Sequence, residues 1–344
     1  MNSTKWLHNL DQSLARRRLL IAATAVAATA LSGLSNASDV RPDPAYPSKP
    51  IRIIVPFPPG GGADIQGRII AKEIGLLLGQ NVIVENRSGA NGGIGARIVA
   101  SAEPDGYTLL VGSTGTHSTN EFLYSKEQPY NSVKDFAPIS LISTFNNGFI
   151  VPASSPIKTL ADLVAAAKKA PGELMYGVTV LGAASHLAVE MFKRDAGINV
   201  TAVPYTGSPP ATMDLLGGRL NFMSDVLATQ RANITSGKVR LIVTTDLKRS
   251  PVFPDTPTIA ELGYPGFTAV GWLGLFAPAG TPPSIVEKLS RTLKKAYENP
   301  EIAQQLTSRG FDAVAMSPEE FTQFLANERE KWSKVIREAG LKLE

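Results

Sequence analysis

Short apolar runs alternate with amphipathic stretches along this chain, and this alternation predicts a repeated order of strand and helix. Ile51–Val55 is a β-branched run of strand length, and 63–78 follows it with apolar residues at helical spacing. Further strands are expected at 82–84 and 107–111, with a helix at 93–102. This order predicts a parallel, doubly wound sheet with helices on both of its faces.

The alternation starts again in a second part of the chain. Helices are expected at 159–170, 185–196 and 211–216, with strands at 175–178, 200–204, 220–223 and 239–245. A proline-rich loop at 251–267 leads to a strand at 273–277 and helices at 283–299 and 318–339. The pattern predicts an α/β fold with two domains, 51–145 plus 271–344 and 146–270, joined by bridging segments near 145–152 and 267–275. Two lobes on two bridges form a hinged cleft, which is a common small-molecule site.

The first 37 residues have the pattern of a signal peptide that is cleaved after about Ala37. Three arginines, 16–18, precede an apolar run at 19–34, and small residues follow it. The run is shorter than the roughly 20 residues that cross a bilayer. The arginines also resemble a twin-arginine signal, and the general secretory route remains an alternative. We therefore expect a periplasmic protein, with residues 38–50 as an extended N-terminal arm.

Charge and composition narrow the function further. Residues 1–37 hold four of the 34 basic and one of the 30 acidic residues, so 30 basic and 29 acidic residues remain. Such a balance gives no support to nucleic-acid binding, which needs a dense basic face. The chain has no cysteine, which excludes disulfides and thiol catalysis. The two histidines beyond residue 37 have no metal-ligand spacing, and no G-x-S-x-G elbow is present, so we expect no enzyme, no metal and no cofactor.

A triple-glycine turn between the first strand and helix carries the strongest chemical signal. Gly60, Gly61 and Gly62 allow close backbone approach, and the helix that starts after them presents unpaired N–H groups to an anion. The turn lacks the lysine and hydroxyl of a P-loop, and Ile65 stands where a dinucleotide-binding fingerprint needs glycine. The alternative is that the glycines only turn the chain and Asp64 only caps the helix.

Two further loops follow expected strands. The turn at 86–95 is rich in glycine, and we favour a packing role for it over a place at the cleft rim. The loop at 112–119 offers hydroxyls, N–H groups and the His117 imidazole near the carboxyl end of a strand, where ligands bind in such sheets. A solvated loop is the alternative there.

These segments together resemble the Bug-type receptors of tripartite tricarboxylate transporters. The resemblance runs from about Tyr46 to the C-terminus and is carried by YPSKPIRIIVPFPPGGGADIQGR, VIVENRSGANGGIGA, PDGYTLL, VPYTGSPPATMDLLGGRLNFM, FPDTPTIAELGYPGF and FAPAGTPPSIVEKL. It implies a two-domain periplasmic binding protein fold, type II-like and of the Venus flytrap kind, with two hinge crossovers. The implied partners are a small organic carboxylate and the membrane permease subunits of the transporter.

The resemblance also implies a set of ligand-binding residues in both domains. The first domain would contribute Gly60, Gly61, Gly62, Ala63, Asp64, Thr114 and Thr116, and the second Val178, Gly182, Ala183, His186, Thr206, Gly207 and Asp225. Phe57 is a candidate for an apolar wall, together with Trp272, although core packing is the alternative for both. Asp225 meets an ammonium or hydroxyl group if it lines the cleft, and otherwise caps a strand end.

One departure from the family pattern bears on the ligand. Val178 and Ala183 stand where hydroxyl residues are common in the family, and Val180 stands where glycine is common. A second ligand carboxylate would lose donors there, at a cost of about 1–3 kcal/mol per buried unpaired group. We therefore expect a ligand less polar than citrate: a monocarboxylate, or an acid with an apolar or aromatic body. A periplasmic sensor that signals to a kinase is the alternative function.

Overall fold

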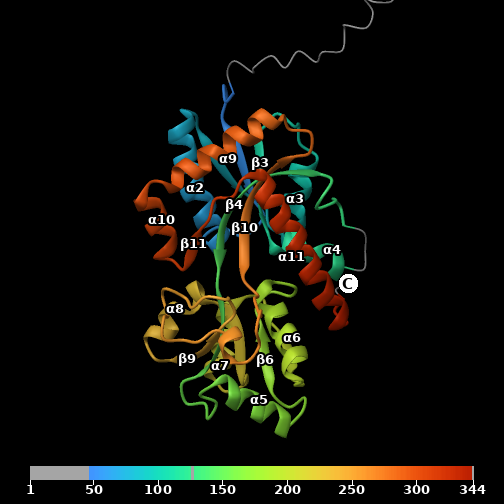
Figure 1. Cartoon of the computed structure of the whole chain (residues 1–344), viewed down its shortest axis with the longest axis vertical. Coiled ribbons are helices and arrows are strands. Elements are labelled where there is room, and N and C mark those ends of the chain that lie inside the picture. The colour runs from blue at the N-terminus through green and yellow to red at the C-terminus, as the bar shows by residue number, and fades with distance from the viewer. Residues whose placement is uncertain (1–45, 125–127, 343–344) are drawn as a thin grey trace, which may run out of the picture. The chain divides into compact units, whose positions relative to one another are not determined.

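A computed structural model describes residues 46–124 and 128–342, all but Tyr46 within the compact unit Pro47–Glu344 (Figure 1). The expected signal peptide and the first part of the N-terminal arm lie outside the described residues. Within those residues, no helix combines the length and the apolar character needed to cross a membrane.

One sheet has six strands in the order β11-β4-β10-β3-β1-β2, and we call it, with the helices packed on it, lobe 1. Its strands are β1 (Ile51–Val55), β2 (Val82–Asn86), β3 (Thr108–Ser113), β4 (Phe136–Phe145), β10 (Gly271–Pro278) and β11 (Phe311–Ala313). Its helices are α2 (Gly62–Leu78), η1 (Ala90–Gly92), α3 (Gly93–Ala100), η2 (Gly115–Thr119), α4 (Asn120–Leu123), α9 (Pro283–Tyr297), α10 (Pro300–Thr307) and α11 (Pro318–Glu338).

The second sheet has five strands in the order β7-β6-β8-β5-β9, and with its helices it makes lobe 2. Its strands are β5 (Asn147–Pro152), β6 (Met175–Val178), β7 (Thr201–Pro204), β8 (Phe222–Val226) and β9 (Val239–Thr244). Its helices are α5 (Leu160–Lys169), α6 (Ala184–Ala196), α7 (Ser208–Leu216), α8 (Leu227–Thr235) and η3 (Ala260–Leu262).

Each sheet is buried by helices on both faces. In lobe 1, α3 and the first half of α11 cover one face through Val99, Phe321 and Leu325. Helices α2 and α9 pack against each other, and they contact strands β2 and β4 respectively. In lobe 2, α5 and α6 share one core cluster with the sheet, and α7 shares another. The expected α/β architecture is therefore confirmed.

The expectation of a parallel sheet was right for part of the sheet and wrong for the rest. β1 runs parallel to β2 and β3, but β10 is antiparallel to β3 and β4. The physical reason is connectivity: β10 returns from lobe 2 and so enters the lobe 1 sheet from the opposite end. Lobe 2 is mixed for a similar reason, because β5 arrives from lobe 1 and pairs antiparallel with β8 and β9.

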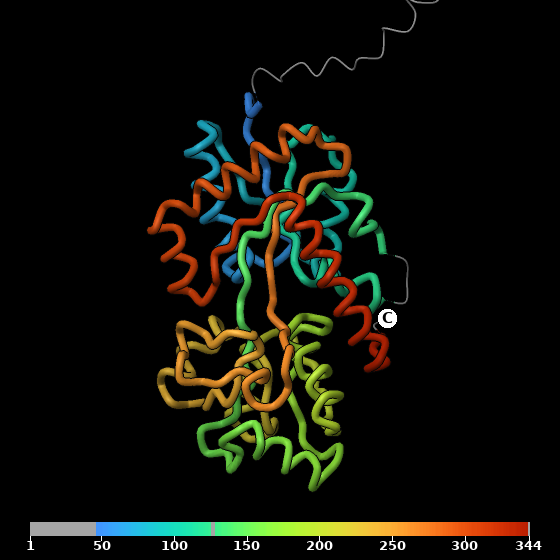
Figure 2. The backbone as a smooth tube through the Cα atoms, in the orientation of Figure 1, coloured from blue at the N-terminus to red at the C-terminus, as the bar shows by residue number. Residues whose placement is uncertain are grey.

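Two passages of main chain connect the lobes. The chain leaves lobe 1 between β4 and β5 at Asn146 and returns just before β10, and Figure 2 shows these green and orange segments side by side. Asn147 Nδ2 donates to Ala269 O at 2.9 Å, and the Thr245 hydroxyl donates to the same oxygen at 2.9 Å. These bonds tie the two passages together at the point where the lobes meet.

Helix α11 is a third connection between the lobes. It begins on lobe 1, but Trp332, Val335 and Ile336 near its end are buried in the core cluster of lobe 2. Between these ends lies Glu328, only 6% exposed, whose Oε2 accepts from the indole N–H groups of Trp272 (3.1 Å) and Trp332 (2.8 Å). Lys331 pairs with the other carboxylate oxygen. Glu328 thus binds the returning strand β10 to the helix that spans both lobes.

We predict that Glu328→Gln lowers the free energy of unfolding by about 1–3 kcal/mol, because the charge opposite Lys331 is lost. Glu328→Leu should cost more, since two buried indole N–H groups are then left without an acceptor. Urea denaturation measures both. The control is Glu330→Gln on the exposed face of the same helix, which should stay within about 0.5 kcal/mol of the parent. A Glu328→Leu protein as stable as the control would contradict the assignment.

Candidate functional site

The triple-glycine turn projects from the end of β1 and leads directly into α2. Gly60, Gly61 and Gly62 are exposed, and Gly60 has φ +77°, a conformation that favours glycine. Helix α2 begins after Gly61 without a side-chain cap. Among the described residues, no hydrogen bond is recorded from the N–H groups of Gly62, Ala63 or Asp64. The helix therefore starts with three free donors and the positive end of its dipole.

Asp64 does not cap α2, which corrects the expectation for its side chain. Its carboxylate accepts from Gly60 N (2.9 Å) and from Asn86 Nδ2 (2.9 Å), and it pairs with Arg68 at 2.9 Å. Burial favours a higher pKa for Asp64, but these hydrogen bonds and the Arg68 charge outweigh it, so the pKa lies below its ordinary value. Asp64 thereby ties the glycine turn to the end of β2 and leaves the helix donors unused.

The three loops at the carboxyl ends of β1, β2 and β3 converge. A Cβ on Gly92 would lie 2.6 Å from Thr116 Cγ2 and 3.5 Å from the Phe57 ring, so Phe57 and Thr116 both pack against this glycine. A Cβ on Gly115 would lie 3.1 Å from Asn91 Nδ2. The packing role favoured for the second glycine turn is therefore present, and the turn brings the first and third loops together.

The hydroxyl groups of Thr114 and Thr116 are both engaged inside lobe 1. Thr114 Oγ1 accepts from Trp272 N at 3.2 Å, and Thr116 Oγ1 accepts from Ser113 N at 2.8 Å. Both residues are buried, so their part in ligand binding stays a prediction. His117 stacks on Phe276 with ring centroids 3.8 Å apart, and burial, followed by the Arg329 charge, lowers its pKa to about 3. His117 is a neutral core residue.

Lobe 2 presents a second uncapped helix start. Val178 is the buried last residue of β6, and the loop after it ends at Ala183, which precedes α6 without capping it by a side chain. In the part of the chain that the structure describes, no hydrogen bond is recorded from the N–H groups of Ala184, Ser185 or His186. Like α2, this helix offers three free donors to an anion.

His186 fixes the loop that precedes α6. Its Nδ1 accepts from Gly182 N at 3.1 Å, which places the ring proton on Nε2. Burial is the main reason that its pKa falls to about 4, with Glu190 raising it and Lys193 lowering it. His186 is therefore neutral at pH 7, and it holds Gly182 close to the first turn of α6.

Asp225 has the same organising role in lobe 2 that Asp64 has in lobe 1. It is 3% exposed and accepts from Gln230 Nε2 (2.7 Å) and Val226 N (2.9 Å). Burial raises its pKa, while hydrogen bonds from Gln230, Ser208, Val226 and Thr179 oppose the rise. The carboxylate thus joins the loop after β6 to the start of α7.

The start of α7 offers fewer main-chain donors than α2 or α6. Gly207 precedes the helix with φ +133°, and Thr206 before it is exposed. Pro209 and Pro210 have no N–H, so Ser208 supplies the one main-chain donor of the first turn. Helix α7 begins three residues earlier than expected because proline is tolerated in a first turn.

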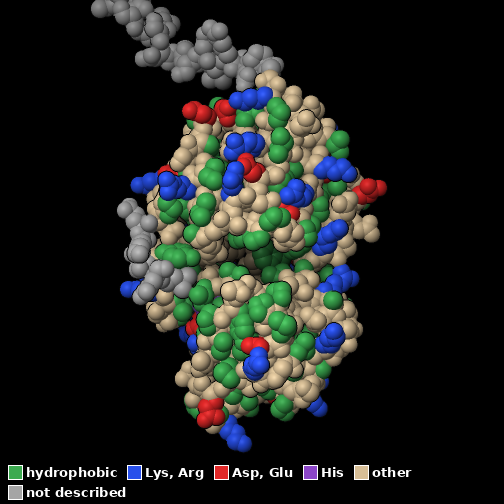
Figure 3. Space-filling model, turned by 180° about the vertical axis from the view of Figure 1, so that it is seen from behind, with side chains coloured by type: hydrophobic (Ala, Val, Ile, Leu, Met, Phe, Trp, Pro, Cys, Tyr) green, Lys and Arg blue, Asp and Glu red, His purple; other side chains and the backbone are tan. Residues whose placement is uncertain are grey.

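One of the two aromatic residues that were candidates for an apolar wall, Trp272, lies elsewhere. Trp272 is fully buried in the lobe 1 core and forms no cleft wall. Instead, Phe311 lies against the glycine turn, with its ring 3.1 Å from the Cβ that Gly62 would carry, and it packs edge-on against Phe145. Sequence analysis missed Phe311 because the three-residue strand β11 has no recognisable pattern. Figure 3 shows the surface hollowed between the lobes on the face opposite to Figure 1.

We predict that Asp64→Asn destabilises the protein by about 1–2 kcal/mol at pH 7, since a hydrogen-bonded ion pair with a half-exposed arginine is lost. A lowered pKa stabilises the fold above the ordinary aspartate pKa, and this contribution is lost as the pH falls through the lowered value. The difference between parent and variant should therefore persist from pH 7 to pH 5 and shrink below about pH 3.9. Urea denaturation across pH tests this, with exposed Asp255→Asn as the control; a difference independent of pH would contradict it.

Comparisons with known proteins identify the family. Residues 67–341 match the tripartite tricarboxylate transporter family receptor. BugT of Bordetella pertussis is 36% identical over 298 residues, 87% of this chain and 91% of BugT. The structure of R. palustris Rpa4515 with adipate has a TM-score of 0.79 and 36% identity, covering 87% of this chain and 100% of that chain. MatC (Rpa3494) from Rhodopseudomonas palustris, solved with bound malate, has a TM-score of 0.73 and 32% identity, covering 84% and 99%. The expected periplasmic binding protein fold is confirmed, and the chain belongs to the family of tripartite tricarboxylate transporter receptors.

Proposed function

We propose that this chain is a periplasmic receptor that binds a small organic carboxylate between its lobes and delivers it to the permease subunits of a tripartite transporter. The observation that carries the proposal is the pair of uncapped helix starts, α2 in lobe 1 and α6 in lobe 2. The relatives solved with adipate and malate support a carboxylate as the ligand. The proposal assigns no catalytic step to any residue.

The two helix starts bind charge without a basic side chain. Free N–H groups and the helix dipole together stabilise an anion. Arg68 is committed to Asp64, and Arg87 pairs with Glu85 at the end of β2. The carboxylate is therefore held by main-chain donors at Gly62–Asp64, with Ala184–His186 facing it from the second lobe.

The side chains near these donors favour a ligand with an apolar body. Phe311 lies against Gly62 in lobe 1, and in lobe 2 Val180 and Leu181 are exposed on the loop before α6. Val178 and Ala183 supply no hydroxyl to a second polar group. Adipate in Rpa4515 is a ligand of this kind, with charged ends and an apolar middle.

Binding is coupled to closure of the cleft. An open form admits the acid, one lobe holds its carboxylate, and the other lobe swings in about the two passages joined by Asn147 and Ala269. Only the closed form presents both lobes in the arrangement that the permease recognises.

We predict that Ala184→Pro weakens carboxylate binding by about 10- to 100-fold, the effect of losing one hydrogen bond to a charged group. Proline fits the first position of a helix, and Ala183 already has the extended conformation that proline requires before it. Calorimetry with adipate, malate, hexanoate, benzoate and citrate gives the affinities. Ala184→Gly keeps the N–H and is the matched control, expected to bind like the parent.

Two results would count against the proposal. Equal affinity in Ala184→Pro and Ala184→Gly would show that this donor does not hold the ligand. Binding of sugars or metal ions, with no acid bound, would show that the ligand is not a carboxylate.

The affinity should be nearly constant between pH 6 and pH 8. His186 is already neutral in this range because its pKa is about 4, and a ligand carboxylate is fully ionised above about pH 6. Below about pH 5 the ligand takes up a proton and binding weakens. Titration calorimetry from pH 4.5 to pH 8 tests this. A tenfold loss of affinity per pH unit between pH 6 and pH 7 would instead indicate a charged histidine partner.

A further inference from the structure

One contact between the lobes involves a glycine of the loop that precedes α6. Thr119 Oγ1, from the end of η2 in lobe 1, donates to Gly182 O in lobe 2 at 3.1 Å. Gly182 has φ +76°, and a Cβ there would lie 2.2 Å from Leu123 Cδ1. The positive φ favours glycine, and a Cβ at this position would overlap Leu123 unless that side chain moved.

Leu123 makes the apolar part of the same contact. It belongs to α4 of lobe 1, yet it is 1% exposed and lies in the core cluster of lobe 2 with Val178, Ala184 and Leu187. Opening the lobes would expose this side chain to water. The contact therefore combines one hydrogen bond with the burial of one leucine, and both favour the closed arrangement.

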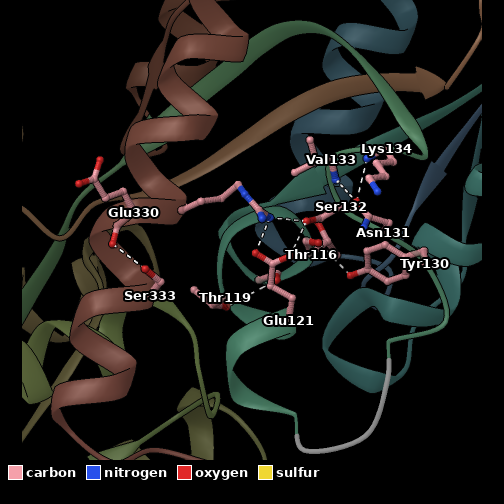
Figure 4. A network of polar contacts seen from close by, with 12 residues as sticks. Thr116, Thr119, Glu121, Tyr130, Asn131, Ser132, Val133, Lys134, Glu330 and Ser333 are labelled. Carbon is pink, nitrogen blue, oxygen red and sulfur yellow. Dashed lines mark hydrogen bonds and ion pairs between the residues drawn. The ribbon is translucent and has the colours of Figure 1, made fainter.

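Side-chain contacts within lobe 1 hold α4, which carries Leu123, in place. Arg329 of α11 pairs with Glu121 (2.5 Å) and donates to the Ser132 hydroxyl (2.5 Å). Figure 4 shows Glu121 and Ser132 close together in this network. Asn91 Nδ2 also donates to Asn120 Oδ1 at 2.9 Å. These contacts fix α4 on lobe 1, so Thr119 and Leu123 move with that lobe.

The lobe 2 side leads directly to the second anion site. Gly182 N donates to His186 Nδ1, so the glycine is tied to the first turn of α6 through its N–H and to Thr119 of lobe 1 through its carbonyl. A displacement of Gly182 would therefore also displace the first turn of α6, where the free N–H donors lie. Thr119 ends the loop at 112–119 that the sequence singled out for its hydroxyl groups, whereas Leu123 was not among the residues that the sequence pointed to.

We infer that Thr119, Leu123 and Gly182 form an interlobe latch that positions the α6 donors against the ligand in the closed form. This inference rests on the proposed function, because the latch regulates the same carboxylate site. Thr119 and Leu123 are positioning residues: they act through the loop at Gly182 and need not touch the ligand.

The latch is tested by measuring lobe separation and affinity in the same variants. The chain has no cysteine, so Lys72→Cys on α2 and Lys168→Cys on α5, both exposed, carry spin labels on opposite lobes without background. In Leu123→Ala, the distance distribution of the ligand-free protein should lengthen or broaden, and adipate should bind about tenfold more weakly, which equals 1.4 kcal/mol. Thr119→Val should weaken binding about three- to tenfold, and Thr119→Ser should restore it.

Leu163→Ala is the control for a general loss of stability. Leu163 is fully buried in the same core cluster but lies on α5, away from the contact between lobes. Its truncation should lower the melting temperature and leave lobe separation and affinity unchanged.

The possible outcomes separate the two proposals. If Leu123→Ala behaves like Leu163→Ala, with parental distances and affinity, the latch is wrong. If no acid binds the parent but the latch variants still shift the distances, the latch stands and the carboxylate ligand is wrong.

Discussion

One buried carboxylate in each lobe determines how the loops of the site are arranged. Asp64 accepts from Gly60 and Asn86 in lobe 1, and Asp225 accepts from Val226 and Gln230 in lobe 2. A buried carboxylate without such donors is costly, so each aspartate holds its neighbouring loops in place. A negative charge beside an anion site would normally repel the ligand. In lobe 1 Arg68 pairs with this charge, and in lobe 2 Asp225 is buried and held by hydrogen bonds from its own loops.

The connections between the lobes limit how they move. Two main-chain passages meet at Asn147 and Ala269, and α11 adds a third link whose ends are buried in different cores, Phe321 in lobe 1 and Trp332 in lobe 2. A rotation that pulled either end of α11 from its core would expose large aromatic side chains to water. Each exposed side chain would cost about 2 kcal/mol. A rotation between the lobes that keeps α11 seated would avoid this cost.

Much of the fold was predictable because hydrophobic periodicity records burial directly. Ile51–Val55 and Met175–Val178 were placed at their observed bounds, since a buried strand of β-branched or apolar residues has few other interpretations. Strand β4 was missed as a strand because Pro138, Ser140 and Ser143 interrupt its apolar pattern. Helix α8 was missed because apolar residues do not gather on one of its faces. Such elements are stabilised by tertiary contacts that the local sequence pattern does not indicate. One of these contacts in β4 is the hydrogen bond from Ser140 Oγ to Met316 O at 2.8 Å.

The site was less predictable than the fold because donor groups can be counted in a sequence but their partners cannot. Thr114 and Thr116 are hydroxyl residues after a strand, yet both hydroxyls are used by nearby main-chain N–H groups. Gly60–Gly62 is a candidate from sequence alone for a physical reason: a helix start without a capping side chain leaves main-chain donors for another partner. Gly182 carries no such local signal. Its φ of +76° favours glycine, and Leu123 approaches from the other lobe to within 2.2 Å of the missing Cβ, which only the folded chain shows.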